Sequence, residues 1–376
     1  MIYLDNAATT PVLSEVADSM ATVLRETYGN PSSIHAAGRN ASKLLRESRE
    51  TIAKHLAVPA NTLTFTSGAS EANNLALVGY ALANQDKGKH LVTTAIEHPS
   101  ILQTLSYLRD RFGFDVTFVK PLPDGTFPAH LITDQLRDDT ILVSVMHANN
   151  ETGQLLPISE IGEVLQTHQA AFHVDAVQSL GKLPIHPEEL HADFLTASAH
   201  KFHGPKGIGF LYHRAGLHFD ALIHGGEQED KRRAGTENLA AIVGMAKAIE
   251  VTSQLPDKTN VLYTQLLTGL ETLKAKTAQD FYLNAPEPHL SSTLNIGFPN
   301  VNHDILLTKL DLAGICVSTG SACTAGTVEP SHVLEAIYGK ESPKLKENIR
   351  VSFSKRTQKE DIDALLSALY TIFRKD

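Results

Sequence analysis

The chain has 376 residues, of which 42% are hydrophobic and 20% charged, so it can bury large cores and is not a mainly disordered protein. The net charge of −9 argues against broad electrostatic binding to nucleic acid or to an anionic membrane. The only two cysteines, Cys316 and Cys323, exclude a disulfide framework and suit a reducing compartment. No apolar run approaches the roughly 20 residues that span a bilayer, and the N-terminus lacks the pattern of a signal peptide. We therefore expect a cytoplasmic protein of two or more domains that binds neither nucleic acid nor membrane directly.

Short apolar runs alternate with helical patterns between about residues 60 and 215. The runs predict strands at 62–66, 90–95, 115–120, 141–146, 171–175, 194–197 and 209–212. The helical patterns lie at 71–84, 100–112, 129–137 and 158–169. Such alternation predicts an α/β fold with a mostly parallel sheet. Because the strands are apolar throughout, we expect helices on both faces of the sheet.

A different pattern follows residue 237. Long helical patterns at 238–253 and 261–277 precede a mixture of strands (292–296, 349–353) and helices (304–312, 359–373). This mixture predicts a smaller α+β domain. A proline and charged residues interrupt the pattern near 254–258, which favours a boundary there. We expect a large domain over 15–254, and a small domain built from 1–14 and 255–376 that contains Cys323.

The run Thr-Ser-Gly-Ala-Ser-Glu at 66–71 lies between a predicted strand end and a predicted helix start. Small residues there allow backbone N–H groups to approach an anion closely, and the hydroxyl groups of Ser67 and Ser70 can add to the site. The alternative is an ordinary helix N-cap with a glutamate in the first turn.

Asp175 ends a buried strand, at the edge of the sheet where doubly wound folds bind ligands. A carboxylate in such a place is costly unless it meets a cation, and a protonated pyridine nitrogen is one such cation. A helix cap or a structural ion pair is the alternative.

Lys201 follows an apolar strand and precedes a Gly/Pro turn. A lysine in an apolar cleft has a lowered pKa and can form a Schiff base with an aldehyde, whereas a lone lysine is usually a solvated surface residue. Ser198 and His200 flank it and can reach a phosphate. His98 follows the strand at 90–95 and can stack on an aromatic cofactor or act as acid or base, although with 18 histidines an ordinary loop residue is the alternative.

Taken together, these features resemble the pyridoxal-phosphate (PLP) enzymes of fold type I. Further segments are similar to those of the cysteine desulfurases of the class V aminotransferase family: 3–10 (YLDNAATT), 28–33 (YGNPSS), 147–153 (HANNETG), 233–236 (RAGT) and 321–324 (SACT). They occur in the expected order and cover nearly the whole chain.

The resemblance implies a role for each matching residue. Lys201 is expected to bind PLP, Asp175 to pair with its pyridine nitrogen, Gln178 to bond its phenolic oxygen, His98 to stack on its ring and assist catalysis, and Ala69, Ser70, Ser198 and His200 to bind its phosphate. Thr236 is expected to reach the phosphate of a neighbouring subunit, which implies a homodimer. Asn150 is expected to contact the cofactor and, with Arg350, to hold the substrate carboxylate. A planar guanidinium suits that role, although a surface arginine is the alternative.

Cys323 lies in a small, polar, glycine-bearing run, which is typical of an accessible loop. We expect Cys323 to be catalytic and Cys316 to be a core residue. The resemblance implies removal of sulfur from L-cysteine, with His98 managing protons on the substrate thiol, to give L-alanine and a persulfide on Cys323. The longer run after Cys323 implies delivery of the sulfur to an acceptor protein, either an iron–sulfur scaffold or a tRNA-thiolation enzyme. Glu227 departs from the family, which often has a glycine there, and nearby basic residues are expected to compensate its charge.

Three alternatives stay open at this point. A selenocysteine lyase uses the same scaffold, and a related PLP aminotransferase or kynureninase-like enzyme does not need Cys323. A catalytically silent scaffold protein is the third, although the combination of Lys201, Asp175, His98 and Cys323 counts against it. No metal site is expected.

Overall fold

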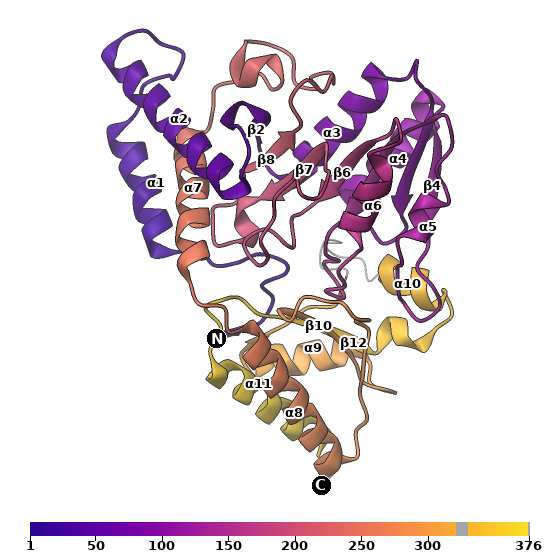
Figure 1. The fold of residues 1–376 in the computed structure, drawn as a ribbon. Helices are drawn as coiled ribbons and strands as arrows, with labels where there is room; N and C mark the ends of the chain where they lie inside the picture. The colour runs from indigo at the N-terminus through magenta and orange to yellow at the C-terminus, as the bar shows by residue number, and fades with distance from the viewer. Residues whose placement is uncertain (321–329, 375–376) are drawn as a thin grey trace.

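The computed structural model describes residues 1–320 and 330–374. A lobe built on a seven-stranded sheet lies against a smaller lobe that contains a three-stranded sheet and the C-terminal helix (Figure 1). Cys323 lies outside the described residues. Within the described part of the chain, no helix is long and apolar enough to cross a membrane.

The large sheet has the strand order β2-β8-β7-β6-β5-β3-β4. Its strands are β2 (Leu63–Thr66), β3 (His90–Thr94), β4 (Asp115–Val119), β5 (Thr140–Met146), β6 (Ala171–Asp175), β7 (Phe194–Ser198) and β8 (Gly209–His213). Strand β8 runs antiparallel to both of its neighbours, and all other neighbouring pairs are parallel. The prediction of an α/β fold with a mostly parallel sheet is therefore confirmed.

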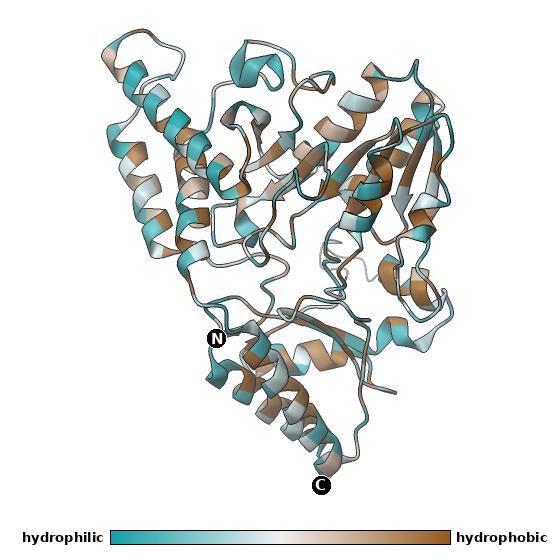
Figure 2. Ribbon diagram, in the orientation of Figure 1, coloured by the Kyte–Doolittle hydropathy of each residue, from teal (hydrophilic) through white to brown (hydrophobic). Residues whose placement is uncertain are grey.

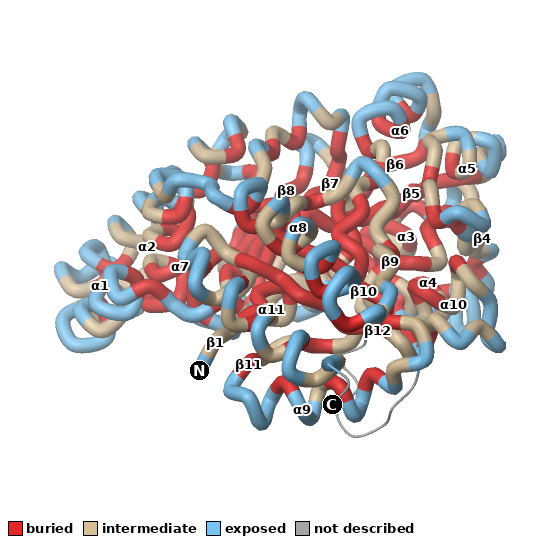
Figure 3. The backbone as a smooth tube through the Cα atoms, turned by 90° about the horizontal axis from the view of Figure 1, so that it is seen from below, coloured by how far each residue is buried: buried red, intermediate tan, exposed pale blue. Residues whose placement is uncertain are grey.

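Both faces of this sheet are covered. Neighbouring residues of one strand enter different apolar clusters: Leu142 and Phe194 pack on one face, Val143 and Leu195 on the other. The first cluster contains residues of α3 (Ala69–Ala83) and α4 (Pro99–Phe112); the second contains residues of α2 (Ala36–Leu56), α6 (Ile158–Leu165) and α7 (Leu239–Gln254). Hydrophobic residues accordingly concentrate on the strands and the helix faces toward them (Figure 2), and the central strands are buried (Figure 3). Burial on both faces explains why these strands do not alternate in polarity.

The smaller lobe packs helices on an antiparallel sheet of order β12-β10-β9. Its strands are β9 (Tyr282–Leu283), β10 (Thr293–Gly297) and β12 (Asn348–Ser352), and its helices are α8 (Thr259–Thr277), α9 (His303–Leu312), α10 (His332–Tyr338) and α11 (Lys359–Phe373). The N-terminal strand β1 (Ile2–Tyr3) pairs with β11 (Ile315–Cys316), so the start of the chain joins this lobe. Four residues separate the end of α7 from the start of α8, and the proposed domain boundary in this interval stays a prediction.

Some elements differ from the sequence-based expectation. Helices α1 (Ser14–Glu26) and α2, which pack on α7, were not predicted. The buried face of α2 combines the small residues Gly38, Ala41 and Ser48 with Ile52 and Leu56, so its large apolar residues are confined to the C-terminal end of the helix. The predicted helices at 129–137 and 158–169 are shorter in the structure: α5 covers His130–Thr133 and α6 covers Ile158–Leu165. The residues that follow α5 and α6 make turns that are held by polar contacts, including one between the Gln169 amide and the Asp138 carbonyl.

Candidate active site

A cavity of about 630 Å³ opens at the carboxyl edge of the large sheet. Its wall includes nearly every residue that the sequence singled out: Ala69, Ser70, His98, Asn150, Asp175, Gln178, Ser198, His200, Lys201 and Arg350. These residues come from segments that follow β2, β3, β5, β6 and β7, and from β12 of the smaller lobe. The carboxyl ends of parallel strands meet at one edge, which explains why residues so far apart in sequence gather here.

Lys201 ends a short 3₁₀ helix, η2 (Ala199–Lys201), that directly follows β7. Its Nζ donates hydrogen bonds to the carbonyl oxygens of Ala7 at 2.6 Å and Ala8 at 2.8 Å. The N-terminal segment therefore lies beside the lysine and forms part of the cavity wall.

Asp175 is the last residue of β6 and is 5% exposed. One carboxylate oxygen accepts a hydrogen bond from Asn73 Nδ2 at 2.9 Å, and the other accepts one from the Val177 backbone N–H at 3.0 Å. Because both oxygens accept from neutral donors, the carboxylate is oriented while its charge has no cation among these partners. This arrangement suits a cationic ring nitrogen in the cavity.

Helix α3 begins at the cavity, and no side chain of its N-cap residue bonds the backbone N–H groups of its first turn. Its N-cap is Gly68, which has no side chain to cap the first-turn N–H groups. Gly68 lies close to Gly209: a Cβ at Gly209 would lie 2.9 Å from the Gly68 Cα, so only a glycine fits there. Burial alone would raise the pKa of Glu71, but the hydrogen bonds from Arg233 and Ser67 outweigh this effect, so the pKa lies below its ordinary value. The helix start therefore suits an anion such as a phosphate group.

The surroundings of two histidines of the cavity lower the pKa of each ring and so favour its neutral form. Burial and the nearby Lys201 and Lys206 lower the pKa of His200 to about 4, and its Nδ1 lies 3.1 Å from Thr9 Oγ1. Burial also lowers the pKa of His98, which is the N-cap of α4, and its Nδ1 accepts from the backbone N–H of Ser100 at 3.1 Å. Both rings can therefore take part in hydrogen bonds without carrying charge.

Gln178 is held from two sides. Its Nε2 donates to the Ala7 carbonyl at 2.9 Å, and its Oε1 accepts from Lys182 Nζ at 3.2 Å. The lysine fixes the orientation of the amide, so the nitrogen, which has two hydrogens, keeps one for a ligand.

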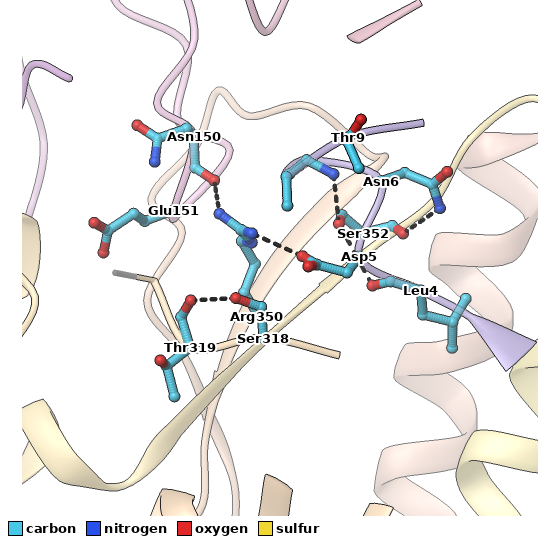
Figure 4. Close-up of polar contacts among 12 residues, drawn as sticks. Leu4, Asp5, Asn6, Thr9, Asn150, Glu151, Ser318, Thr319, Arg350 and Ser352 are labelled. Carbon is cyan, nitrogen blue, oxygen red and sulfur yellow. Dashed lines mark hydrogen bonds and ion pairs between the residues drawn. The ribbon is translucent and has the colours of Figure 1, made fainter. Parts of the chain in front are cut away.

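Arg350 crosses from the smaller lobe into the cavity and is 2% exposed (Figure 4). One terminal nitrogen donates to Asp5 Oδ1 at 2.7 Å and the other donates to the Asn150 carbonyl at 2.9 Å. Its Nε and the Asn150 Oδ1 are buried with no hydrogen-bond partner among the described residues. Unpaired buried polar atoms are costly, which suits a polar ligand at this point. The Arg350 side chain is not the surface arginine that the sequence left open.

Two predicted residues are not placed in this cavity. Thr236 is exposed and lines a neighbouring hollow of about 190 Å³, whose wall also includes Ser67 and Gly207 of the main cavity. Cys323 lies outside the described residues, although Gly320, three residues earlier, lines the main cavity. Cys316 is half-buried in β11.

A model of the aminotransferase class-V family matches residues 2–365. The chain belongs to this family. Within this class-V aminotransferase family, it is 46% identical to a putative cysteine desulfurase IscS 1 of Bacillus subtilis, over 94% of this chain and 93% of the relative. It is 43% identical to cysteine desulfurase IscS of Dictyoglomus turgidum, over 100% of this chain and 95% of the relative.

Solved structures with the same fold include two at 35% sequence identity. A NifS-like protein superposes with a TM-score of 0.90 at 35% identity, covering 99% of this chain and 98% of that one. A second structure, SspA in complex with cysteine, superposes with a TM-score of 0.83 at 35% identity, covering 95% of this chain and 100% of that one. The chain is thus a class-V enzyme with the fold type I of PLP-dependent transferases, and PLP is the cofactor of these cysteine desulfurases.

The residues present fit PLP. The uncapped start of α3 suits its phosphate, the oriented carboxylate of Asp175 suits its pyridine nitrogen, and Lys201 supplies an amine at the wall of the same cavity. The charge of the unusual Glu227 is compensated as expected: it pairs with Lys231 at 2.9 Å on the surface.

Several residues of the site escaped the sequence reasoning. They are Asp5, Ala7, Ala8, Asn73, Ser100 and Lys182. Asn73 carried one usable signal, because it is a polar residue among the apolar residues of α3. The others act through contacts with residues distant in sequence or through backbone atoms, which no local pattern reveals.

Proposed function

We propose that this class-V enzyme removes the sulfur atom from L-cysteine, releases L-alanine and passes the sulfur through Cys323 to an acceptor protein. The observation that carries the proposal is the joint placement of Lys201, Asp175 and Arg350 around one cavity of about 630 Å³. The cysteine bound in the related SspA structure supports the choice of substrate.

Bound PLP supplies an electron sink for the α-carbon of the amino acid. Arg350 would hold the substrate carboxylate through its buried Nε–H, which has no partner among the described residues. The amide nitrogen of Asn150 would donate to the same carboxylate. Asp175 would keep a proton on the pyridine nitrogen, because its carboxylate is oriented by Asn73 and Val177. These contacts orient the α-carbon toward Lys201.

Lys201 would accept the α-proton of the substrate, since its amine lies at the cavity wall. The Cys323 thiolate would then attack the substrate sulfur. A sulfur–sulfur bond forms and the carbon–sulfur bond breaks; its electron pair stays with carbon, which takes up protons to give alanine. Gly320 supports this role for Cys323, because three residues of chain span at most about 11 Å from the cavity wall.

The proposal includes a homodimer in which Thr236 of each subunit reaches the phosphate of the other. Thr236 is exposed and its hollow adjoins the cavity. Tyr28 and Ile34, between α1 and α2, are 87% and 90% exposed, and such apolar side chains suit a subunit contact. Sedimentation of the PLP-loaded protein tests the dimer.

Three single variants test the chemistry by sulfide release, alanine formation and cofactor absorbance. Cys323→Ala is expected to lose sulfide release and keep the absorbance, while Lys201→Ala loses both. Cys316→Ala is the matched control and is expected to keep both. Full sulfide release by Cys323→Ala would refute the role of this thiol, and faster turnover of selenocysteine than of cysteine would favour a selenocysteine lyase.

A further inference from the structure

Two polar side chains connect Asp175 to His98 beside the cavity. Asn73 is fully buried in α3, and its Nδ2 donates to Asp175 Oδ2 at 2.9 Å and to Ser100 Oγ at 2.9 Å. Ser100 Oγ lies 2.8 Å from His98 Nδ1. The four side chains form one continuous series of hydrogen bonds, from the residue expected at the pyridine nitrogen to the residue expected above the ring.

The direction of each hydrogen bond in this series is determined. The Asp175 carboxylate accepts, so the atom of Asn73 facing it is the amide nitrogen, whose two hydrogens point to Asp175 and Ser100. A flipped amide would place the Asn73 oxygen against the carboxylate. Ser100 Oγ accepts from Asn73. Because the Ser100 backbone N–H already requires a lone pair at His98 Nδ1, the Ser100 hydroxyl donates its own hydrogen to that atom.

The backbone of Ser100 adds a second donor at the same ring atom. Its N–H, which can only donate, points to His98 Nδ1 at 3.1 Å. Both contacts require a lone pair at Nδ1, so the hydrogen of the neutral ring lies on Nε2. No residue in the described ranges hydrogen-bonds to Nε2, which leaves this N–H for the cavity.

The charges around the ring agree with a neutral imidazole. Burial lowers the pKa of His98; Asp175 opposes this effect, while Lys201 and His332 add to it, and the net pKa is lowered. A neutral ring that accepts hydrogen bonds at Nδ1 can only donate from Nε2, so Nε2 presents an N–H group to the substrate.

We propose that Asn73 and Ser100 are positioning residues that hold His98 as the Nε2–H tautomer, so that His98 offers the substrate a hydrogen-bond donor and not a base. The tautomer of His98 is argued from the hydrogen bonds alone, and only the identity of the substrate that it faces rests on the proposed function. To accept a proton at Nε2, the neutral ring would have to carry its hydrogen on Nδ1, directly against the Ser100 N–H. The first acceptor of a proton from the substrate thiol is then a group other than His98.

Solid-state NMR of microcrystalline, PLP-loaded enzyme labelled with ¹⁵N-histidine tests the tautomer directly. The His98 signals are identified by their absence in His98→Gln. We expect the Nδ1 signal of an unprotonated nitrogen and the Nε2 signal of a protonated one at neutral pH. A protonated Nδ1 would overturn the proposal.

Ser100→Ala and Thr104→Val are a matched pair. Both remove one hydroxyl that links α4 to α3. The Thr104 hydroxyl contacts Asn74 and the Ser100 backbone carbonyl, whereas only the Ser100 hydroxyl contacts Asn73 and His98. We expect Ser100→Ala to lower kcat about three- to ten-fold and to shift the Nδ1 signal, because the hydroxyl donor is lost while the backbone N–H of residue 100 keeps Nδ1 unprotonated. Thr104→Val is expected to change neither.

Equal effects of the two variants would overturn the positioning role. An Nε2–H signal in an enzyme that releases no sulfide from cysteine would support the tautomer and overturn the proposed function instead, so the two failures are distinguishable.

Discussion

Replacing Asp5 should reveal how strongly the structure depends on the charge of Arg350. The guanidinium is 2% exposed, and Asp5, 19% exposed at its side chain, is its paired carboxylate at 2.7 Å (Figure 4). Asp5→Ala leaves this buried cation with the Asn150 carbonyl as its remaining acceptor. Removal of one partner of a buried pair typically costs about 3–5 kcal/mol, and the partial exposure of Asp5 places the expected loss near 3 kcal/mol.

Asp5→Asn separates the charge from the hydrogen bond. The amide keeps an oxygen toward Arg350 but loses the charge, so we expect a smaller loss of about 1–2 kcal/mol. Urea unfolding followed by circular dichroism, at one protein concentration and with unchanged slope, measures both losses. Arg350→Met combined with Asp5→Ala completes a double-mutant cycle, and the double variant should lose less than the sum of the two single variants.

A loss below about 1 kcal/mol for Asp5→Ala would show that Arg350 does not need this carboxylate. Strict additivity in the cycle would show that the two side chains do not interact. Either result would refute the reasoning from the 2.7 Å contact.

Three further predictions concern buried groups. Burial raises the pKa of Glu97 from 4.5 to about 8, so the protonated side chain contributes its full stability below pH 4.5, and this contribution is lost as the pH rises through 8. The stability of Glu97→Gln in urea should therefore fall less between pH 5 and pH 8 than that of the wild type. Burial, Lys201 and Arg350 lower the pKa of Lys182 from 10.5 to about 7, so the stability of the wild type in urea should rise between pH 7 and pH 10. Lys182→Met should abolish this rise. It should also shift the pH titration of cofactor absorbance, because Gln178 loses its lysine donor. In Gly79→Ala the new Cβ would lie 2.4 Å from the Asp220 carbonyl oxygen, so a loss of about 1–3 kcal/mol should lower the melting temperature, and an unchanged melting temperature would contradict the close approach.

The central sheet could be predicted because its strands are short apolar runs between polar turns. The predicted range 171–175 coincides with β6, and 359–373 coincides with α11. Helices α1 and α2, which pack on α7, were missed, because the first two-thirds of α2 buries small residues such as Gly38 and Ala41 and its large buried apolar residues, Ile52 and Leu56, lie only near its end. Packing decides such helices more than local pattern does.

The residues of the site also differ in whether local sequence or tertiary contacts determine their role. Asp175 and Lys201 were predictable because Asp175 ends one strand and Lys201 lies three residues after the end of another, at the edge where ligands bind in this class of fold. Asp5 was not, because its partner Arg350 lies 345 positions later. The role of Asn73 likewise depends on a contact with Asp175 that is 102 positions away. Local sequence therefore predicts which residues reach the cavity, and tertiary structure alone determines what holds them there.

The N-terminal segment also sets the order in which the enzyme can mature. Asn6 hydrogen-bonds the carbonyl of Ser352, 346 positions away, and Ala7 and Ala8 accept from Lys201. During translation, Asn6 is made long before β12, so its bond to Ser352 can close only after β12 has been synthesised. A nascent chain that ends before β12 therefore also lacks Arg350, which forms part of the cavity wall.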